Sequence, residues 1–222
     1  MSWTVAARLF HGVTALVAAF ALVTQLVLTA SGAATLVETD PPGLAERLFH
    51  LVSYFTILSN VLVLITTIAA ARDPRRDGPV WRVLRLDAVV AITVTGIVHW
   101  FLLRPLLDLQ GWSYAVDKLL HVAVPLLSVI GWLFFGPRRR VSGRVVLLAL
   151  IFPFGWLAYT LLVGVLTGWY PYPFLNVAVE GPAAVSVAVL GITVLLSALS
   201  VLVWWADRVL GPAPRPDVDP RP

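Results

Sequence analysis

The chain has 222 residues, of which 59% are hydrophobic and only 13% are charged. A soluble domain is about one-quarter charged, so this composition excludes that class and indicates a membrane protein. The net charge of +4 requires no nucleic-acid partner, because no basic loop carries the interleaved aromatic residues that stack on bases. The chain has no cysteine, which excludes disulfides, thiolate metal sites and cysteine nucleophiles.

Six apolar stretches approach or exceed the length of about 20 residues that a bilayer-spanning helix requires. They cover roughly 6–30, 48–71, 86–103, 117–135, 145–167 and 183–206, and the third and fourth are short. They predict an all-α polytopic membrane fold with one six-helix domain over residues 1–210. Residues 30–34 resemble a signal-peptide cleavage region, but the apolar run before them is longer than a signal core, so we expect the segment to remain. The proline-rich tail, 211–222, is predicted to be disordered.

The distribution of basic residues predicts the orientation. Thirteen of the 16 lie near the N-terminus, in the second-to-third and fourth-to-fifth connections, and after the last helix. The other three are Arg47, Arg104 and Lys118. Because basic loops remain in the cytoplasm, both termini are predicted to be cytoplasmic, with anionic lipid head groups as partners of the basic loops.

Two patterns mark the last third of the chain. Gly164 and Gly168 are four residues apart, which favours close helix packing, either within the chain or between copies, so the oligomeric state stays open. Residues 168–176 are rich in aromatic residues and proline, which is typical of a stiff turn at the head-group layer. The chain shows no internal repeat of the kind found in many transporters.

The candidate site consists of polar residues in the outer half of the membrane. Thr56 lies in the second apolar stretch and His121 in the fourth. A buried ionisable group in a membrane is costly and marks a functional site, and a hydroxyl beside a histidine is the minimal nucleophile and base pair. Helix rise places Thr56 about 13 Å deeper than Arg47, at the outer end of its helix, but His121 only about 5 Å deeper than Lys118. If the two residues are to meet, a helix tilt or a shifted helix end has to make up this difference in depth.

Other polar residues share this outer half and are predicted to support catalysis or bind substrate. They are His50, Ser53 and Asn60, which form one helical stripe with Thr56 at intervals of 3, 3 and 4, together with His99 on the third stretch and Asp117 on the fourth. Each also has a structural explanation: a helical threonine commonly bonds to its own backbone, and Ser53 or Asn60 can join helices. Asn60, His99 or a backbone amide could hold an oxyanion.

No familiar cofactor or metal signature is present. The chain lacks a Gly-x-Ser-x-Gly elbow, a His-Glu-x-x-His zinc helix and a phosphate-binding glycine loop. Carboxylates at Asp108, Asp117 and Glu180 could assist the histidines, but their spacing is not diagnostic of a metal site. We therefore predict no metal and no cofactor.

Three motifs resemble a known family. Tyr54-Phe-Thr-Ile-Leu-Ser-Asn60, His121-x-x-x-Pro125 and Tyr170-Pro-Tyr-Pro-Phe-Leu175, in this order, resemble the androgen-induced protein family over roughly residues 45–205. The family includes the androgen-dependent regulator of tissue factor pathway inhibitor and bacterial six-span relatives. The resemblance implies a multi-pass plasma-membrane hydrolase of fatty acid esters of hydroxy fatty acids or similar lipid esters, with Thr56 as nucleophile and His121 as its partner. The pair Ser59-Asn60 has no counterpart in the animal motif.

The sequence therefore favours an intramembrane lipid-ester hydrolase, and two alternatives stay open. One is a redox protein that holds one haem between His50, His99 and His121. The other is a transporter or scaffold without catalysis, against which stand the missing repeats and the lack of an acidic residue at mid-membrane.

Overall fold

The computed structural model describes residues 2–33 and 42–210, and within these ranges it contains helices and loops but no strand. Among the described residues, six helical segments are long and apolar enough to cross a membrane. This confirms the predicted all-α fold and the multi-pass character of the chain. The predicted tail, 211–222, lies outside the described residues.

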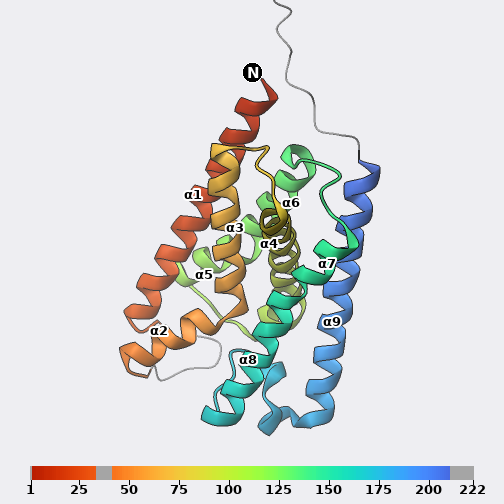
Figure 1. Cartoon of the computed structure of the whole chain (residues 1–222). Helices are drawn as coiled ribbons and strands as arrows, with labels where there is room; N and C mark the ends of the chain where they lie inside the picture. The colour runs from red at the N-terminus through yellow and green to blue at the C-terminus, as the bar shows by residue number, and fades with distance from the viewer. Residues whose placement is uncertain (1, 34–41, 211–222) are drawn as a thin grey trace, which may run out of the picture.

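The helices form an elongated bundle (Figure 1). The six membrane-length segments are Trp3–Ala30, Phe55–Arg72, Pro79–Leu106, Gly111–Phe135, Gly143–Thr167 and Val177–Val209. Within them the α-helices are α1 (Trp3–Ala30), α3 (Phe55–Arg72), α4 (Pro79–Val98), α5 (Gly111–Lys118), α6 (Val124–Phe135), α7 (Gly143–Ala149), α8 (Ile151–Thr167) and α9 (Val177–Val209). Helix α4 is the most buried, because it packs against α3, α6, α7 and α9.

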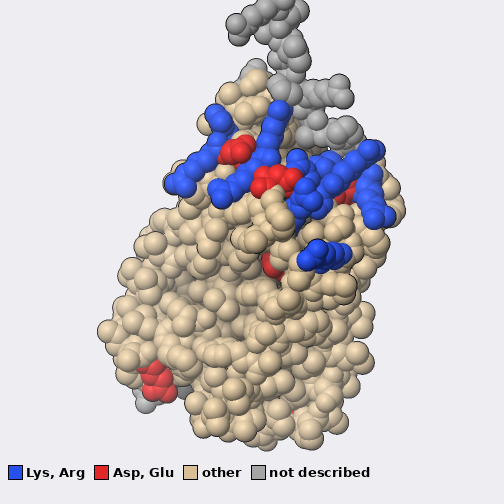
Figure 2. Space-filling model, viewed as in Figure 1, with Lys and Arg blue, Asp and Glu red and all other residues tan. Residues whose placement is uncertain are grey.

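Charged residues gather at one end of the bundle. Figure 2 shows most Lys and Arg side chains at the end where α1 begins and α9 ends, which we call the basic end. There the buried carboxylate of Asp207 accepts hydrogen bonds from the backbone amides of Arg140 (2.7 Å) and Val141 (2.8 Å). Asp207 therefore fixes the connection between α6 and α7 to the end of α9.

The second segment is not the single helix over 48–71 that the sequence predicts. It divides into α2 (Leu44–Ser53) and α3, because Tyr54 is extended at φ −70° and ψ 129°. Helix α8 stabilises the break: the Trp156 indole donates to the Ser53 carbonyl at 2.9 Å, and Tyr159 contacts the Ser53 hydroxyl at 2.7 Å. The expected continuous polar stripe is therefore interrupted, and Thr56 becomes the second residue of a new helix.

The third and fourth segments are longer than predicted, and each contains a π-helical turn near the candidate site. α4 continues as a π-helical turn (His99–Leu103) and a 3-10 turn (Arg104–Leu106). A second π-helical segment, Leu119–Ala123, joins α5 to α6. Pro125 explains the second of these, because proline has no amide hydrogen to donate to the carbonyl of His121, four residues earlier. Such π-helical turns occur frequently at functional sites.

The aromatic segment after α8 folds into the bundle rather than forming only a membrane-edge turn. Gly168 ends α8 in the left-handed conformation at φ 76°, and a 3-10 turn (Pro173–Leu175) follows. Tyr170 and Tyr172 are buried, at 5% and 6% exposure. A Cβ on Gly164 would overlap the Tyr170 ring, so this glycine accommodates a tyrosine of the following loop and not the neighbouring helix that the sequence pattern suggests.

Candidate functional site

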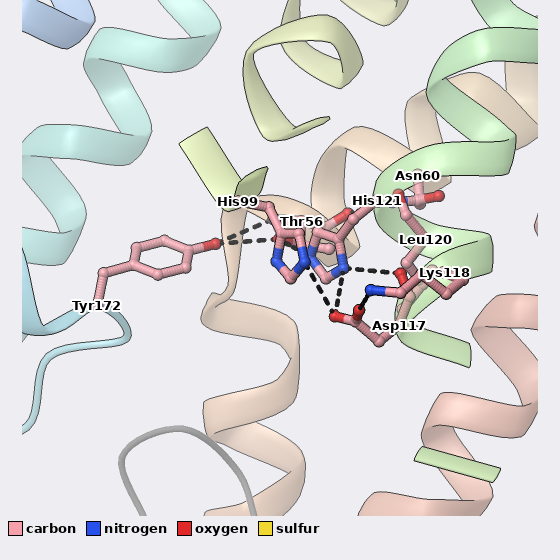
Figure 3. Close-up of polar contacts among 8 residues, drawn as sticks. All are labelled: Thr56, Asn60, His99, Asp117, Lys118, Leu120, His121 and Tyr172. Atoms are coloured by element: carbon pink, nitrogen blue, oxygen red, sulfur yellow. Dashed lines mark hydrogen bonds and ion pairs between the residues drawn. The ribbon is translucent and has the colours of Figure 1, made fainter. Parts of the chain in front are cut away.

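Thr56 differs from other helical threonines in what its hydroxyl contacts. Five threonine hydroxyls donate to the carbonyl one turn earlier in their own helix: Thr14, Thr66, Thr67, Thr93 and Thr167. Because Tyr54 is extended, Thr56 has no complete turn of helix before it. Its Oγ1 lies 3.3 Å from His121 Nε2 and 3.3 Å from the Tyr172 hydroxyl (Figure 3). The structural explanation that accounts for these five threonines therefore does not apply to Thr56.

The contacts of His121 orient its ring as a base requires. Its Nδ1 lies 3.0 Å from the Asp117 carbonyl oxygen and 3.0 Å from Asp117 Oδ1. A neutral imidazole carries one hydrogen, and these two acceptors place it on Nδ1. Nε2 is then left with a lone pair that faces the Thr56 hydroxyl. The sequence predicted that Thr56 lies deeper than His121 unless a helix end is shifted. Both helix starts are shifted: α3 begins after the Tyr54 break, and the fourth segment begins at Gly111 and not at 117.

Asp117 is the carboxylate of the site, and not only an anion at the interface. It is buried, and its Oδ2 binds Lys118 Nζ at 2.9 Å. Its Oδ1 lies 3.0 Å from His121 Nδ1 and 3.3 Å from His99 Nε2. A carboxylate held in this way at Nδ1, the ring nitrogen that does not face Thr56, fixes the orientation of the ring.

His99 joins this carboxylate from the third segment. Its ring stacks on that of His121, with centroids 3.7 Å apart and planes 12° apart. Its side chain is 2% exposed. Figure 3 shows both imidazoles turned towards Asp117, while the Tyr172 hydroxyl reaches towards Thr56 from another side. His99 therefore supports His121 through the stacked rings and the shared carboxylate.

Tyr172 is the site residue that reasoning from individual residues missed. Its hydroxyl accepts from the Thr56 backbone amide at 3.2 Å and contacts Thr56 Oγ1. Burial raises the pKa of the Tyr172 hydroxyl, so it stays protonated. The signal that could have found it is the tyrosine placed between Pro171 and Pro173, whose rings stiffen the loop.

The remaining predicted residues take different positions. Asn60 donates from Nδ2 to the Thr56 carbonyl at 2.8 Å and to the Leu120 carbonyl at 3.3 Å, so it joins the second and fourth segments. Because this amide is engaged by carbonyls, Asn60 is a poorer oxyanion donor than Tyr172. Ser53 donates to the Phe49 carbonyl at 2.8 Å and contacts the Tyr159 hydroxyl of α8. His50 stacks on Trp169 with ring centroids 3.8 Å apart and lines the larger cavity described next.

Two cavities meet at Thr56. The larger, about 140 Å³, is lined by the catalytic candidates and by residues from α1, α2 and the third segment. The smaller, about 50 Å³, is lined almost entirely by apolar side chains of α4, α8, α9 and the Tyr172 loop. Thr56, Leu103 and Tyr172 line both. The hydroxyl of Thr56 thus faces space that suits an amphiphilic molecule with long apolar parts.

One group of side chains has the composition of a metal site. His99, Asp117 and His121 each offer one ligand atom, and these atoms lie within 4.8 Å of one another. The sequence spacing did not indicate this set, because its members come from two separate segments.

Comparisons of the chain with protein-family models, curated proteins and solved structures give no match.

Proposed function

We propose that this chain is an intramembrane hydrolase of lipid esters, with Thr56 as nucleophile and His121 as base. The observation that carries the proposal is the hydrogen-bonded series from Asp117 through His121 to the Thr56 hydroxyl. A nucleophile within reach of a base, which a third group orients, is the arrangement that activates a hydroxyl for acyl transfer.

Acylation begins at the Thr56 hydroxyl. His121 Nε2 takes its proton as Oγ1 attacks the ester carbonyl carbon, and Asp117 stabilises the resulting imidazolium. The tetrahedral intermediate collapses when the bond to the leaving alcohol breaks and His121 gives the proton to that oxygen. The product of this half-reaction is an acyl ester on Thr56.

In the proposed mechanism, the oxyanion of the tetrahedral intermediate forms beside the N-terminus of α3. The first amides of a helix have no partner within the helix, and the helix dipole favours negative charge there. The Tyr172 hydroxyl lies at this helix end and accepts from the Thr56 amide, so its own O–H can donate to a carbonyl oxygen that binds there. Preorganised donors of this kind stabilise the transition state by roughly 3–4 kcal/mol each.

Deacylation uses the same groups in reverse. A water molecule in the larger cavity attacks the acyl carbonyl, and His121 takes its proton. The proton then returns to Thr56 Oγ1 as the carboxylic acid leaves.

The position of the site favours a lipid as substrate. Thr56 lies in the half of the bundle away from the basic end, which we place in the cytoplasm because basic loops remain there. Exposed apolar residues surround the bundle, as in a multi-pass plasma-membrane protein. An ester near the head-group layer, with its chains between helices, suits this position, and branched esters of hydroxy fatty acids are the first class to test.

The two other functions have less support. Axial histidines of one haem stand on opposite faces of the iron, whereas His99 and His121 stack directly on each other. Transport requires no fixed contact between a threonine and a histidine, so it leaves the geometry at Thr56 without an explanation.

The test is turnover of a long-chain fluorogenic ester and a branched hydroxy-fatty-acid ester by purified protein. Thr56→Ala and His121→Ala are expected to lower kcat by about a thousandfold or more. Matched controls are Thr67→Ala, on the same helix and equally buried, and His11→Ala, a buried histidine of α1. Equal activity in folded wild type and Thr56→Ala would contradict the proposal.

A further inference from the structure

Three donor atoms from two segments converge beside the proposed base. They are His99 Nε2, Asp117 Oδ1 and His121 Nδ1. Asp117 Oδ1 lies 3.3 Å from the first nitrogen and 3.0 Å from the second. The His99 and Asp117 side chains are buried, and that of His121 is 13% exposed.

The spacing suits a tetrahedral ion. Zinc binds imidazole nitrogen at about 2.0–2.1 Å and carboxylate oxygen at about 2.0–2.2 Å. Two ligands at the tetrahedral angle are therefore about 3.3 Å apart, close to both distances from Asp117. Two nitrogens and one oxygen are also a ligand set that zinc accepts, whereas magnesium and calcium prefer oxygen. Binding of one ion by both nitrogens requires the stacked rings, whose planes are 12° apart, to tilt so that their in-plane lone pairs converge.

Two further features favour a bound cation. His99 Nε2 is buried, and its described contact is with Asp117 Oδ1 at 3.3 Å, so both atoms face the place where an ion would lie. Asp117 Oδ2 is held by Lys118, an outer contact of the type that orients metal-binding carboxylates. All three candidate ligands line the larger cavity, so an ion held by them would be reached from that space.

We propose that His99, Asp117 and His121 bind Zn²⁺ reversibly and that the bound ion switches the hydrolase off. A neutral His121 that binds zinc through Nδ1 carries its single hydrogen on Nε2. Nε2 then donates to Thr56 Oγ1 and cannot take its proton. Zinc binding stands on the three ligands alone, whereas the inhibition rests on the proposed function.

Binding is tested on tag-free protein, stripped with a chelator and titrated with Co²⁺, whose visible absorption reports tetrahedral nitrogen and oxygen ligation. Wild type and Thr56→Ala, which keeps all three ligands, are expected to bind one ion each. His99→Ala and Asp117→Asn are expected to bind at least about tenfold more weakly, with His99→Gln as a second variant if the alanine form does not fold. His50→Ala removes another histidine of the same cavity and is expected to match wild type. Equal binding by wild type and the folded His99 variants would overturn the site.

Inhibition is tested by ester turnover in the presence of Zn²⁺. Wild type is expected to lose activity and to regain it with a chelator, whereas the remaining activity of the His99 variant is expected to be insensitive to zinc at the same concentration. An increase of turnover with zinc would overturn the inhibitory role. If the chain has no esterase activity, the cobalt titration still decides whether the site exists, so the two proposals fail separately.

Discussion

The Thr56 hydroxyl lies 3.3 Å from His121 Nε2, because two helices depart from regular geometry at the same level. The second segment breaks at Tyr54 and restarts, which places Thr56 at the N-terminus of α3. The fourth widens into a π-helical turn that contains His121. Both departures cost backbone hydrogen bonds, and together they leave a hydroxyl and an imidazole facing each other.

Tyr172→Phe removes the hydroxyl that contacts the Thr56 amide and Oγ1. We expect kcat to fall by about 10²–10³, as when one oxyanion donor is lost, with a smaller change in KM. Steady-state kinetics on the fluorogenic ester measures both. Tyr170→Phe removes a hydroxyl from the same loop and is the control. Similar effects of the two substitutions would argue against a role of Tyr172 at the reacting atoms.

The Tyr172 hydroxyl is expected to remain a donor at alkaline pH. Burial raises its pKa, so the protonated form persists beyond the ordinary tyrosine value of about 10. The ratio of wild-type kcat to Tyr172→Phe kcat should therefore stay constant as pH rises towards about 10. A ratio that falls to one below that pH would show that Tyr172 has ionised and has lost the donor role.

Asp117→Asn removes the charge beside His121 Nδ1. An amide in its place can donate to Nδ1 and so favour the tautomer with hydrogen on Nε2, which cannot accept from Thr56. We expect kcat to fall by about 10²–10⁴, the upper value being that of an aspartate-to-asparagine change in a known triad. Asp108→Asn, at an exposed carboxylate of the preceding loop, should leave kcat near wild type. A similar loss in both variants would point to a general effect of charge.

Gly164→Ala tests how the Tyr172 loop is positioned. The new Cβ would overlap the Tyr170 ring, so the loop has to shift and carry Tyr172 with it. We expect lower activity and destabilisation by about 1–3 kcal/mol, as for overpacking, measured by kcat and thermal melting. Gly155→Ala, on the same helix with no neighbour near its Cβ, is the matched control. Wild-type behaviour of Gly164→Ala would mean that the loop does not depend on this contact.

Asp207→Ala is expected to destabilise the fold without changing the chemistry. It leaves the amides of Arg140 and Val141 without their shared acceptor, and a buried unpaired donor costs about 1–3 kcal/mol. A loss of about 2–5 kcal/mol should appear as a lower melting temperature, with kcat per folded molecule unchanged. The exposed Asp73, which accepts from the Arg75 amide, supplies the control Asp73→Ala. A lower kcat in the folded Asp207 variant would contradict the view that these hydrogen bonds stabilise the fold without affecting the candidate site.

The sequence predicted the bundle more completely than the site. The length of the apolar stretches and the placement of the basic loops suffice to predict six spans, because insertion into a bilayer constrains both features. Thr56, His121 and Asp117 could be named from their residue types, but their contact could not be predicted, because it depends on the Tyr54 break. That break is stabilised by Trp156 and Tyr159 of α8, far along the chain. The sequence assigned Tyr172 to a membrane-edge turn, because the periodicity of a sequence predicts which face of a helix is buried but not whether a loop folds into the bundle.

The most direct test of the central claim is the intact mass of the protein after rapid quenching during turnover of a long-chain ester. We predict an adduct with the mass of the acyl group that fragmentation maps to Thr56. It is absent in Thr56→Ala and forms much more slowly in His121→Ala, because His121 is the base for acylation. An adduct of equal amount in Thr56→Ala, or one mapped to another residue of the active protein, would contradict the assignment of Thr56 as nucleophile.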